Sequence, residues 1–199
     1  MTNYIFSKIA KEGLRHGQKP GSVDSRDWFR ESAREVATVN EKTIMAKRAG
    51  KTLQSILKQD DIGRMYMFFY DAKTKEKLPF WDRFPLVIPI KRTPDGFLGL
   101  NLHYLPHLLR AKLFDNLYNF EVADNIRNSN RLALKYSFLQ ASSKLKYFQP
   151  CLKRYLFDHV RSRFLYIPAE EWDIALFLPT ERFQKDTKQN VWKESRNAV

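Results

Sequence analysis

The sequence predicts a mainly β protein with some helix, an SH3-like small β-barrel of about five strands. Two observations lead to this expectation. Pro79, Pro85 and Pro89 interrupt an aromatic-rich segment, and proline is confined to edge or bent strands of a sheet. Short apolar or alternating runs also recur along the chain, at 64–70, 84–90, 97–105, 131–141 and 164–167. Short bent strands in a meander, with helices inserted near the end, are typical of a small barrel.

Residues 1–60 are predicted to form an N-terminal arm with one short helix at about 26–36. Ser25 is a suitable N-cap for that helix, and Asp27 lies in its first turn. Trp28 and Phe29 are its aromatic anchors. Residues 37–60 are polar and only weakly periodic, so we expect extended or irregular structure there.

Residues 61–179 are predicted to form the barrel with its inserted helices. The sequence "RTPDG" at 92–96 is a turn signal, because proline presets φ and Asp-Gly accepts positive φ. Pro106 can begin a helix, and the leucines that follow at spacing four extend it. A further helix is expected at about 150–161, and another from Pro168. Residues 180–199 are polar and are predicted to be a C-terminal tail.

Composition limits the class of protein. A chain of 199 residues with 43% hydrophobic residues is long enough for one globular core. No apolar run reaches about 18 residues, so no membrane span is expected. The N-terminus lacks the apolar region of a secretory signal. Cys151 is the only cysteine, which excludes an internal disulfide and fits assembly in a reducing cytoplasm.

The formal net charge of +13 favours a polyanionic partner. The charge is concentrated in residues 125–163. This segment contains nine basic residues and one acidic residue, Asp158, so its net charge is +8. The nine are Arg127, Arg131, Lys135, Lys144, Lys146, Lys153, Arg154, Arg161 and Arg163. Aromatic residues interleave with them, and exposed aromatics can stack on bases while cations neutralise phosphates. Nucleic acid and an acidic protein neighbour would both satisfy this face.

Catalytic and metal-binding patterns are weak. His103 and His107 are four residues apart, but Pro106 lies between them and breaks the helical spacing that a metal site would need. No cluster of acids, phosphate loop or nucleophile motif occurs in the sequence. We therefore expect no enzyme activity, catalytic residue, metal or cofactor. His103 shares one strand face with Asn101, which indicates an interface or buried hydrogen bonds.

Three long stretches carry a family resemblance: "GRMYMFFYDAKTKEKLPFWDRFPLVIPI", "DGFLGLNLHYLP" and "CLKRYLFDHVRSRFLYIPAEEWDIALFLPTERF". They resemble a family of small structural or assembly proteins from large contractile-tailed, myovirus-type bacteriophages. The resemblance covers roughly residues 28–196.

The resemblance implies a non-enzymatic virion protein of the neck, tail or baseplate, assembled in the host cytoplasm. It would join other phage structural proteins within a symmetric assembly, without a membrane. Trp28, Phe29 and Trp192 would then anchor partners, because aromatics outside a core often insert into neighbouring subunits. The alternative is a DNA-binding protein for packaging or for protecting DNA ends, which would use the basic face at 125–163.

Overall fold

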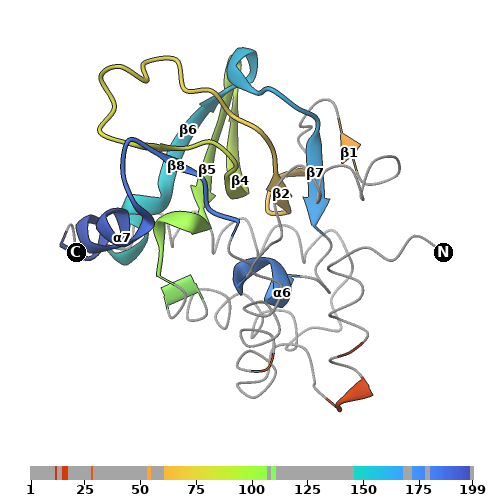
Figure 1. Cartoon of the computed structure of the whole chain (residues 1–199). Helices are drawn as coiled ribbons and strands as arrows, with labels where there is room; N and C mark the ends of the chain where they lie inside the picture. Colours follow the sequence, from red (N-terminus) through yellow and green to blue (C-terminus); the bar gives the residue numbers. More distant parts are fainter. Residues whose placement is uncertain are drawn as a thin grey trace.

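A computed structural model describes residues 12, 15–17, 28, 53–54, 61–106, 109–110, 146–167, 172–177 and 180–197, and the structural statements below concern these residues. Its main feature is an antiparallel sheet with the strand order β1-β7-β2-β4-β5-β6 (Figure 1). The strands are β1 (Leu53–Gln54), β2 (Met65–Met67), β4 (Leu86–Thr93), β5 (Gly96–Asn101), β6 (Leu152–Leu156) and β7 (Phe164–Ile167). A second sheet pairs β3 (Trp81–Asp82) with β8 (Phe183–Gln184).

The hairpin of β4 and β5 forms where the turn signal predicts it. Thr93 pairs with Gly96, and the pairing continues to Val87 and Asn101 at the other end. The register shifts between Pro89 and Lys91, because proline has no N–H to donate to the ladder. The turn chemistry and a proline bulge therefore set the geometry of the longest strand pair.

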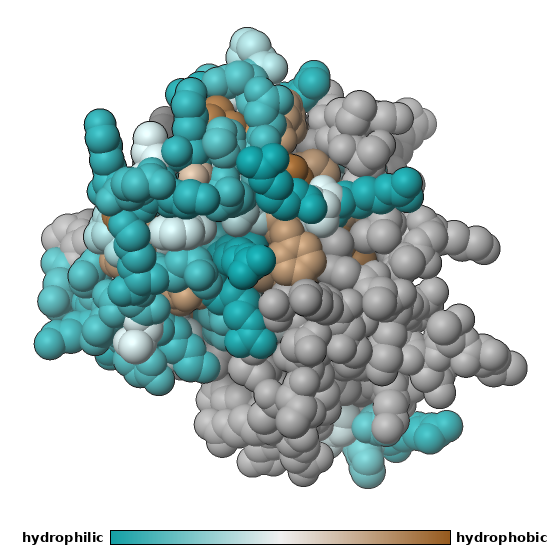
Figure 2. Space-filling model, turned by 45° about the horizontal axis from the view of Figure 1, so that its top comes forward, coloured by the Kyte–Doolittle hydropathy of each residue, from teal (hydrophilic) through white to brown (hydrophobic). Residues whose placement is uncertain are grey.

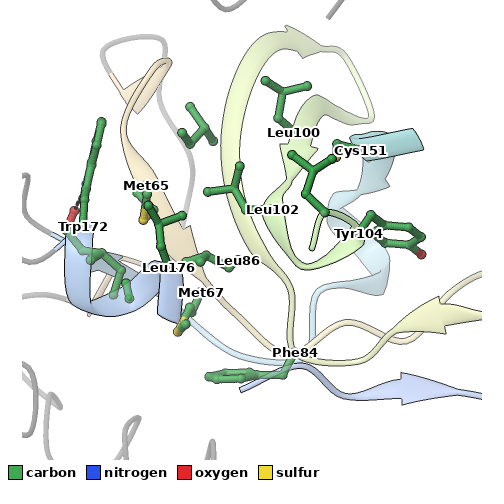
Figure 3. Close-up of a cluster of buried hydrophobic side chains, with 14 of the residues drawn as sticks. Met65, Met67, Phe84, Leu86, Leu100, Leu102, Tyr104, Cys151, Trp172 and Leu176 are labelled. Atoms are coloured by element: carbon green, nitrogen blue, oxygen red, sulfur yellow. Dashed lines mark hydrogen bonds between the residues drawn. The ribbon is translucent and has the colours of Figure 1, made fainter. Parts of the chain in front are cut away.

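The sheet buries both of its faces. One face packs on the helix-side cluster, which includes Met65, Met67, Leu86, Ile88, Leu100, Cys151, Leu165, Trp172, Leu176 and Val191. In Figure 3, Trp172 and Leu176 of the helix lie beside Met65 and Met67 of β2. The other face forms the aromatic cluster of Tyr66, Phe68, Tyr70, Ala72, Val87, Phe97, Tyr155 and Phe164. Alternate residues of β2, β4 and β7 thus enter different clusters, as the period of two requires.

The helix-side cluster is covered by short helices and 3-10 turns. These are η2 (Leu102–Tyr104), η3 (Lys146–Cys151), α6 (Trp172–Phe177) and α7 (Lys188–Asn197). α6 lies below the sheet and α7 beside η2 and the lower end of β5 (Figure 1). η4 (Phe157–His159) joins β6 to β7.

The sequence predictions are confirmed at the level of fold class, since the described residues are mainly β with helices. The number of strands differs from the prediction, with six in the main sheet and two in the small one. β1 and β6 are the ends of the strand order, and no ladder joins them within the described ranges. Closure into a barrel therefore stays a prediction.

Three elements match the expected positions. β2 lies within the strand predicted at 64–70, β7 coincides with 164–167, and α6 falls in the helix expected after Pro168. The strand expected at 97–105 is shorter, because Leu102–Tyr104 turn into η2. The strand expected at 131–141, the helix at 26–36 and most of the helix from Pro106 lie outside the described residues.

The helix predicted at about 150–161 is wrong. Leu152–Leu156 form β6, and they pair with β5 along its length, for example Tyr155 with Phe97. The rings of this pair stack with centroids 5.2 Å apart. Helical propensity over such a short segment is a weak preference, and cross-strand pairing with an aromatic partner outweighs it.

The predicted tail at 180–199 contains β8 and α7. The backbone N–H of Asn190 donates to Thr187 Oγ1 at 3.3 Å, so Thr187 caps α7. Val191 is fully buried against the sheet. In the sequence, the cap residues Asp186 and Thr187 were the available signal for the start of α7. The segment was nevertheless predicted to be a tail, because its residues are mostly polar. None of the helices described is long and apolar enough to cross a membrane.

Candidate nucleic-acid interface

Two cavities lie on either side of Tyr70 and Trp81, which line both of them. The first cavity, of about 510 Å³, lies between the loop at 71–80 and strand β6. The second, of about 620 Å³, lies between that loop and Arg161, which follows η4. Figure 2 shows one face of the molecule, where apolar patches emerge between hydrophilic side chains. We call the first cavity the β6 cavity and the second cavity the η4 cavity.

Basic side chains line both cavities. The β6 cavity has Lys73, Lys153 and Arg154 in its wall. The η4 cavity has Lys75, Arg83 and Arg161. The fold therefore gathers cations from the 71–83 segment and from the 153–161 segment around one pair of aromatic residues.

The acidic side chains in the same walls are already bound to the protein. Both carboxylate oxygens of Asp95 accept from Arg154 Nη2, at 2.9 and 2.7 Å, and the Arg154 guanidinium holds the Asp95 pKa below its usual value. Asp71 accepts from Lys75 Nζ at 3.2 Å. Both pairs are exposed to water, so competition from a polyanion would cost little. These contacts within the protein are therefore weak.

Lys153 has an unusual environment for a lysine of a binding surface. Its ammonium lies 4.1 Å from the centroid of the Tyr104 ring, which is cation–π geometry. Burial lowers the Lys153 pKa, and the nearby Cys151 acts in the opposite direction. A partly desolvated ammonium gains more from an incoming anion than a solvated one does.

The predicted basic residues divide into three groups. Lys153, Arg154, Arg161 and Arg163 are described, and the first three line the two cavities. Arg163 is exposed beside them in the sequence. Lys146 lies in η3, but its side chain is outside the described part of the chain. Arg127, Arg131, Lys135 and Lys144 lie outside the described residues altogether.

Three basic residues of this surface were not among the binding residues predicted from the sequence. Lys73, Lys75 and Arg83 lie in the segment at 71–83, which precedes the basic segment at 125–163 in the chain. These three residues are far from residues 153–161 in the sequence, so a charge count over contiguous segments does not join them. The fold brings the two sets of cations together. The lysines and the aromatic Trp81 in one short connection were the available signal.

The predicted partner anchors have contacts within the protein. Trp28 packs against the helix-side cluster and near His16, with ring centroids 5.8 Å apart. The Trp192 indole N–H donates to the His103 carbonyl at 2.7 Å. Phe29 lies outside the described residues. A role of these residues toward another subunit stays a prediction.

His103 belongs to a buried hydrogen-bond network. Its Nδ1 donates to Asp82 Oδ2 at 2.6 Å, and its Nε2 lies 3.2 Å from Thr180 Oγ1. An acid, a histidine and a hydroxyl in this order resemble a catalytic triad in connectivity. All three side chains are buried. The sequence indicated an interface or buried hydrogen bonds for His103, and the structure shows buried hydrogen bonds.

A buried ion pair adjoins this network. Arg110 donates to Glu181 at 2.6 Å and to the carbonyl oxygens of Leu105, Leu176 and His103. These contacts tie η2, α6 and the start of the C-terminal segment together. No group of three or more potential metal ligands occurs among the residues that the structure describes.

A small antiparallel β domain with cations gathered beside aromatic cavities is typical of proteins that bind polyanions such as nucleic acid. The chain matches the family model of the phage T4 terminal DNA protecting protein over residues 6–195. It therefore belongs to this family of bacteriophage proteins, which confirms the resemblance to a phage family. No curated protein and no solved structure shows significant similarity to the chain. The family favours the DNA alternative over a place in the neck, tail or baseplate.

Proposed function

We propose that this protein binds the ends of linear phage DNA and protects them from nucleases. The observation that carries the proposal is the family match over nearly the whole chain, because the family is described by terminal DNA protection. In this proposal the protein acts as a bound cap, so it requires neither a catalytic residue nor a cofactor. A cap on packaged DNA would be found in the virion, after assembly in the host cytoplasm.

The surface around the two cavities supports DNA as the partner. Six cations line the cavities, and two of the three acids in the same walls are occupied by exposed ion pairs. The third, Asp82, is buried in the His103 network. Cations beside aromatic rings suit phosphates next to unstacked bases better than they suit a uniformly acidic protein surface. Contacts with other phage structural proteins remain a prediction.

We also propose that the five strands β7-β2-β4-β5-β6 curl into an SH3-like barrel. The short 3-10 turn η4 carries the chain from β6, beside β5, to β7, beside β2. Tyr70 and Val160 form a bridge that extends the contact between the two ends of this path. The aromatic cluster draws residues from all five strands or their immediate extensions, as the interior of a barrel would.

End protection is tested with an exonuclease. Linear duplex DNA incubated with the protein should be degraded slowly, whereas the same duplex cut internally after removal of the free protein should be degraded from the new ends. Equal digestion with and without saturating protein would overturn the proposal. Equal affinity for linear and covalently closed DNA would also overturn it, because a cap must recognise termini.

Charge reversal tests which surface meets the DNA. Arg161→Glu with Arg163→Glu should flatten the plot of log K against log salt by about 1.8, because each phosphate contact contributes about 0.9. The matched control is Lys193→Glu with Arg196→Glu, which makes the same charge change on exposed positions of α7. If both pairs change the slope equally, only net charge matters and the assigned surface is wrong.

A further inference from the structure

The β6 cavity has features that phosphate contacts alone do not use. Its walls include two pairs of aromatic rings. Tyr70 and Tyr155 have centroids 4.9 Å apart, and Phe80 and Tyr104 have centroids 5.9 Å apart. A groove that only follows a DNA backbone has no need for such walls. Tyr70, Tyr104 and Tyr155 are no more than 8% exposed, so the half-buried rings of Phe80 and Trp81 are the aromatic walls on which a nucleobase would stack, in any sequence.

Trp81 adds a hydrogen-bond donor without a partner. Its indole Nε1 is buried and has no hydrogen-bond partner among the residues that the structure describes. Trp81 also lines the cavity, and its backbone is held by the pairing of β3 with Gln184 of β8. A buried unpaired N–H is costly, so a ligand that brings an acceptor oxygen or nitrogen would be stabilised there.

The loop that carries this wall is held in place. Lys185 Nζ donates to the carbonyl oxygens of Glu76 and Leu78, at 3.0 and 3.1 Å. β8 and the residue that follows it, Lys185, therefore support Trp81 and the loop at 71–80, respectively. The cavity is thus a preformed feature of the fold, and its volume of about 510 Å³ lies in the range of small-ligand sites.

We propose that the β6 cavity holds the terminal, unpaired nucleotide of the DNA end. The base lies against the aromatic walls, the Trp81 N–H donates to an acceptor of the nucleotide, and Lys153 binds its phosphate. This inference rests on the proposed end-binding function and gives it a recognition mechanism. Unpairing a terminal base is less costly than extruding one from within a duplex, so the cavity selects ends.

The test compares two DNA molecules of equal length. One duplex has single-nucleotide overhangs, and the other is closed by hairpin loops at both ends and has no free terminal nucleotide. Trp81→Phe keeps a ring and removes the N–H, while Lys153→Met keeps the stem and removes the charge. Each should weaken binding of the overhang duplex about threefold to tenfold, the worth of one hydrogen bond or partly buried ion contact. Binding of the hairpin-closed duplex should change by less than half as much.

The hairpin-closed duplex also reports folding, because a misfolded variant would lose affinity for both molecules. Lys193→Met is the matched control, and it should leave the preference for overhangs unchanged. If wild-type protein protects ends while both variants retain the full preference, the cavity assignment is overturned and the end-binding function stands. If wild-type protein binds neither duplex, the proposed function itself has failed. The chain has four tryptophans, so the Trp81 signal is the tryptophan fluorescence that wild type has and Trp81→Phe lacks. Quenching of that signal by a glutamate peptide but not by a deoxynucleoside monophosphate would assign the cavity to an acidic protein and overturn the inference.

Discussion

His103 Nδ1 lies 2.6 Å from Asp82 Oδ2, and neither side chain is more than 1% exposed. The pair joins the end of β5 to β3, and Thr180 on the other side of the imidazole joins both to the C-terminal segment. Asp82 Oδ1 also accepts from the backbone N–H groups of Phe84 and Arg182. One carboxylate thus holds together parts of the chain about a hundred residues apart, and it supports the strand that carries Trp81.

Replacing Asp82 by Asn should destabilise the protein by about 3 kcal/mol, because in either orientation the new amide nitrogen would face an N–H that can only donate, from the Asn101 amide or from the backbone of Phe84 and Arg182. Urea unfolding measures the change. Asp71→Asn is the control, since Asp71 forms a half-exposed ion pair with Lys75 and should cost less than about 1 kcal/mol. Similar losses in the free energy of unfolding for the two variants would show that burial of the network contributes nothing to stability.

Arg110→Lys should be strongly destabilising despite the conserved charge. The guanidinium donates to four acceptors in a planar arrangement, and an ammonium cannot reach all of them. We expect a loss of about 2–4 kcal/mol, measured by chemical denaturation. Arg110→Met should cost more alone than together with Glu181→Gln, because the double variant leaves no unpaired charge. Strict additivity in this cycle would contradict the buried ion pair.

Gly96→Ala should disrupt the pairing of β5 with β6, because a Cβ at this position would overlap the backbone carbonyl of Tyr155. A Cβ at Gly99 would meet a side-chain methyl of Val87, which can move more easily. Thermal unfolding should therefore show Gly96→Ala as the less stable variant, with Gly99→Ala losing about 1–3 kcal/mol. The reverse order would mean that β6 approaches β5 less closely than the structure indicates.

The stability of the protein should fall at alkaline pH because of Cys151. Burial raises the Cys151 pKa to about 12, whereas an exposed thiol ionises near 8.5. Above pH 9 the unfolded state therefore binds fewer protons at this site than the folded state, and the free energy of unfolding falls with pH. The contribution of this thiol is about 1.4 kcal/mol per pH unit up to the folded pKa.

The measurement compares wild type with Cys151→Ala between pH 8 and pH 11. Tyrosines titrate in both proteins, so the difference between the two slopes isolates the thiol. The native thiol should also resist a disulfide exchange reagent at pH 8 and react only on unfolding, since it is fully buried. Parallel slopes and rapid native labelling would contradict the burial of Cys151.

Local signals in the sequence predicted several elements well. The turn at Asp95-Gly96, the short strand at 164–167 and the helix after Pro168 follow from residues that restrict the backbone by themselves. The helix predicted at 150–161 failed because Tyr155 pairs with Phe97, which lies more than fifty residues earlier. Residues 180–199 look polar, yet Val191 and Trp192 fix α7 to the core through contacts with distant elements.

The sequence by itself determined the fold class, the phage family and the excess of positive charge, because composition, turn residues and long motifs are properties of the linear chain. Only the tertiary structure decided which of these charges lie together. It brought Lys73, Lys75 and Arg83 beside Lys153, Arg154 and Arg161, and it placed Trp81 between the two cavities. It also showed that His103 is buried in a hydrogen-bond network with Asp82 and Thr180. Cross-strand pairing and burial connect residues far apart in the chain, and no local pattern specifies which ones will meet.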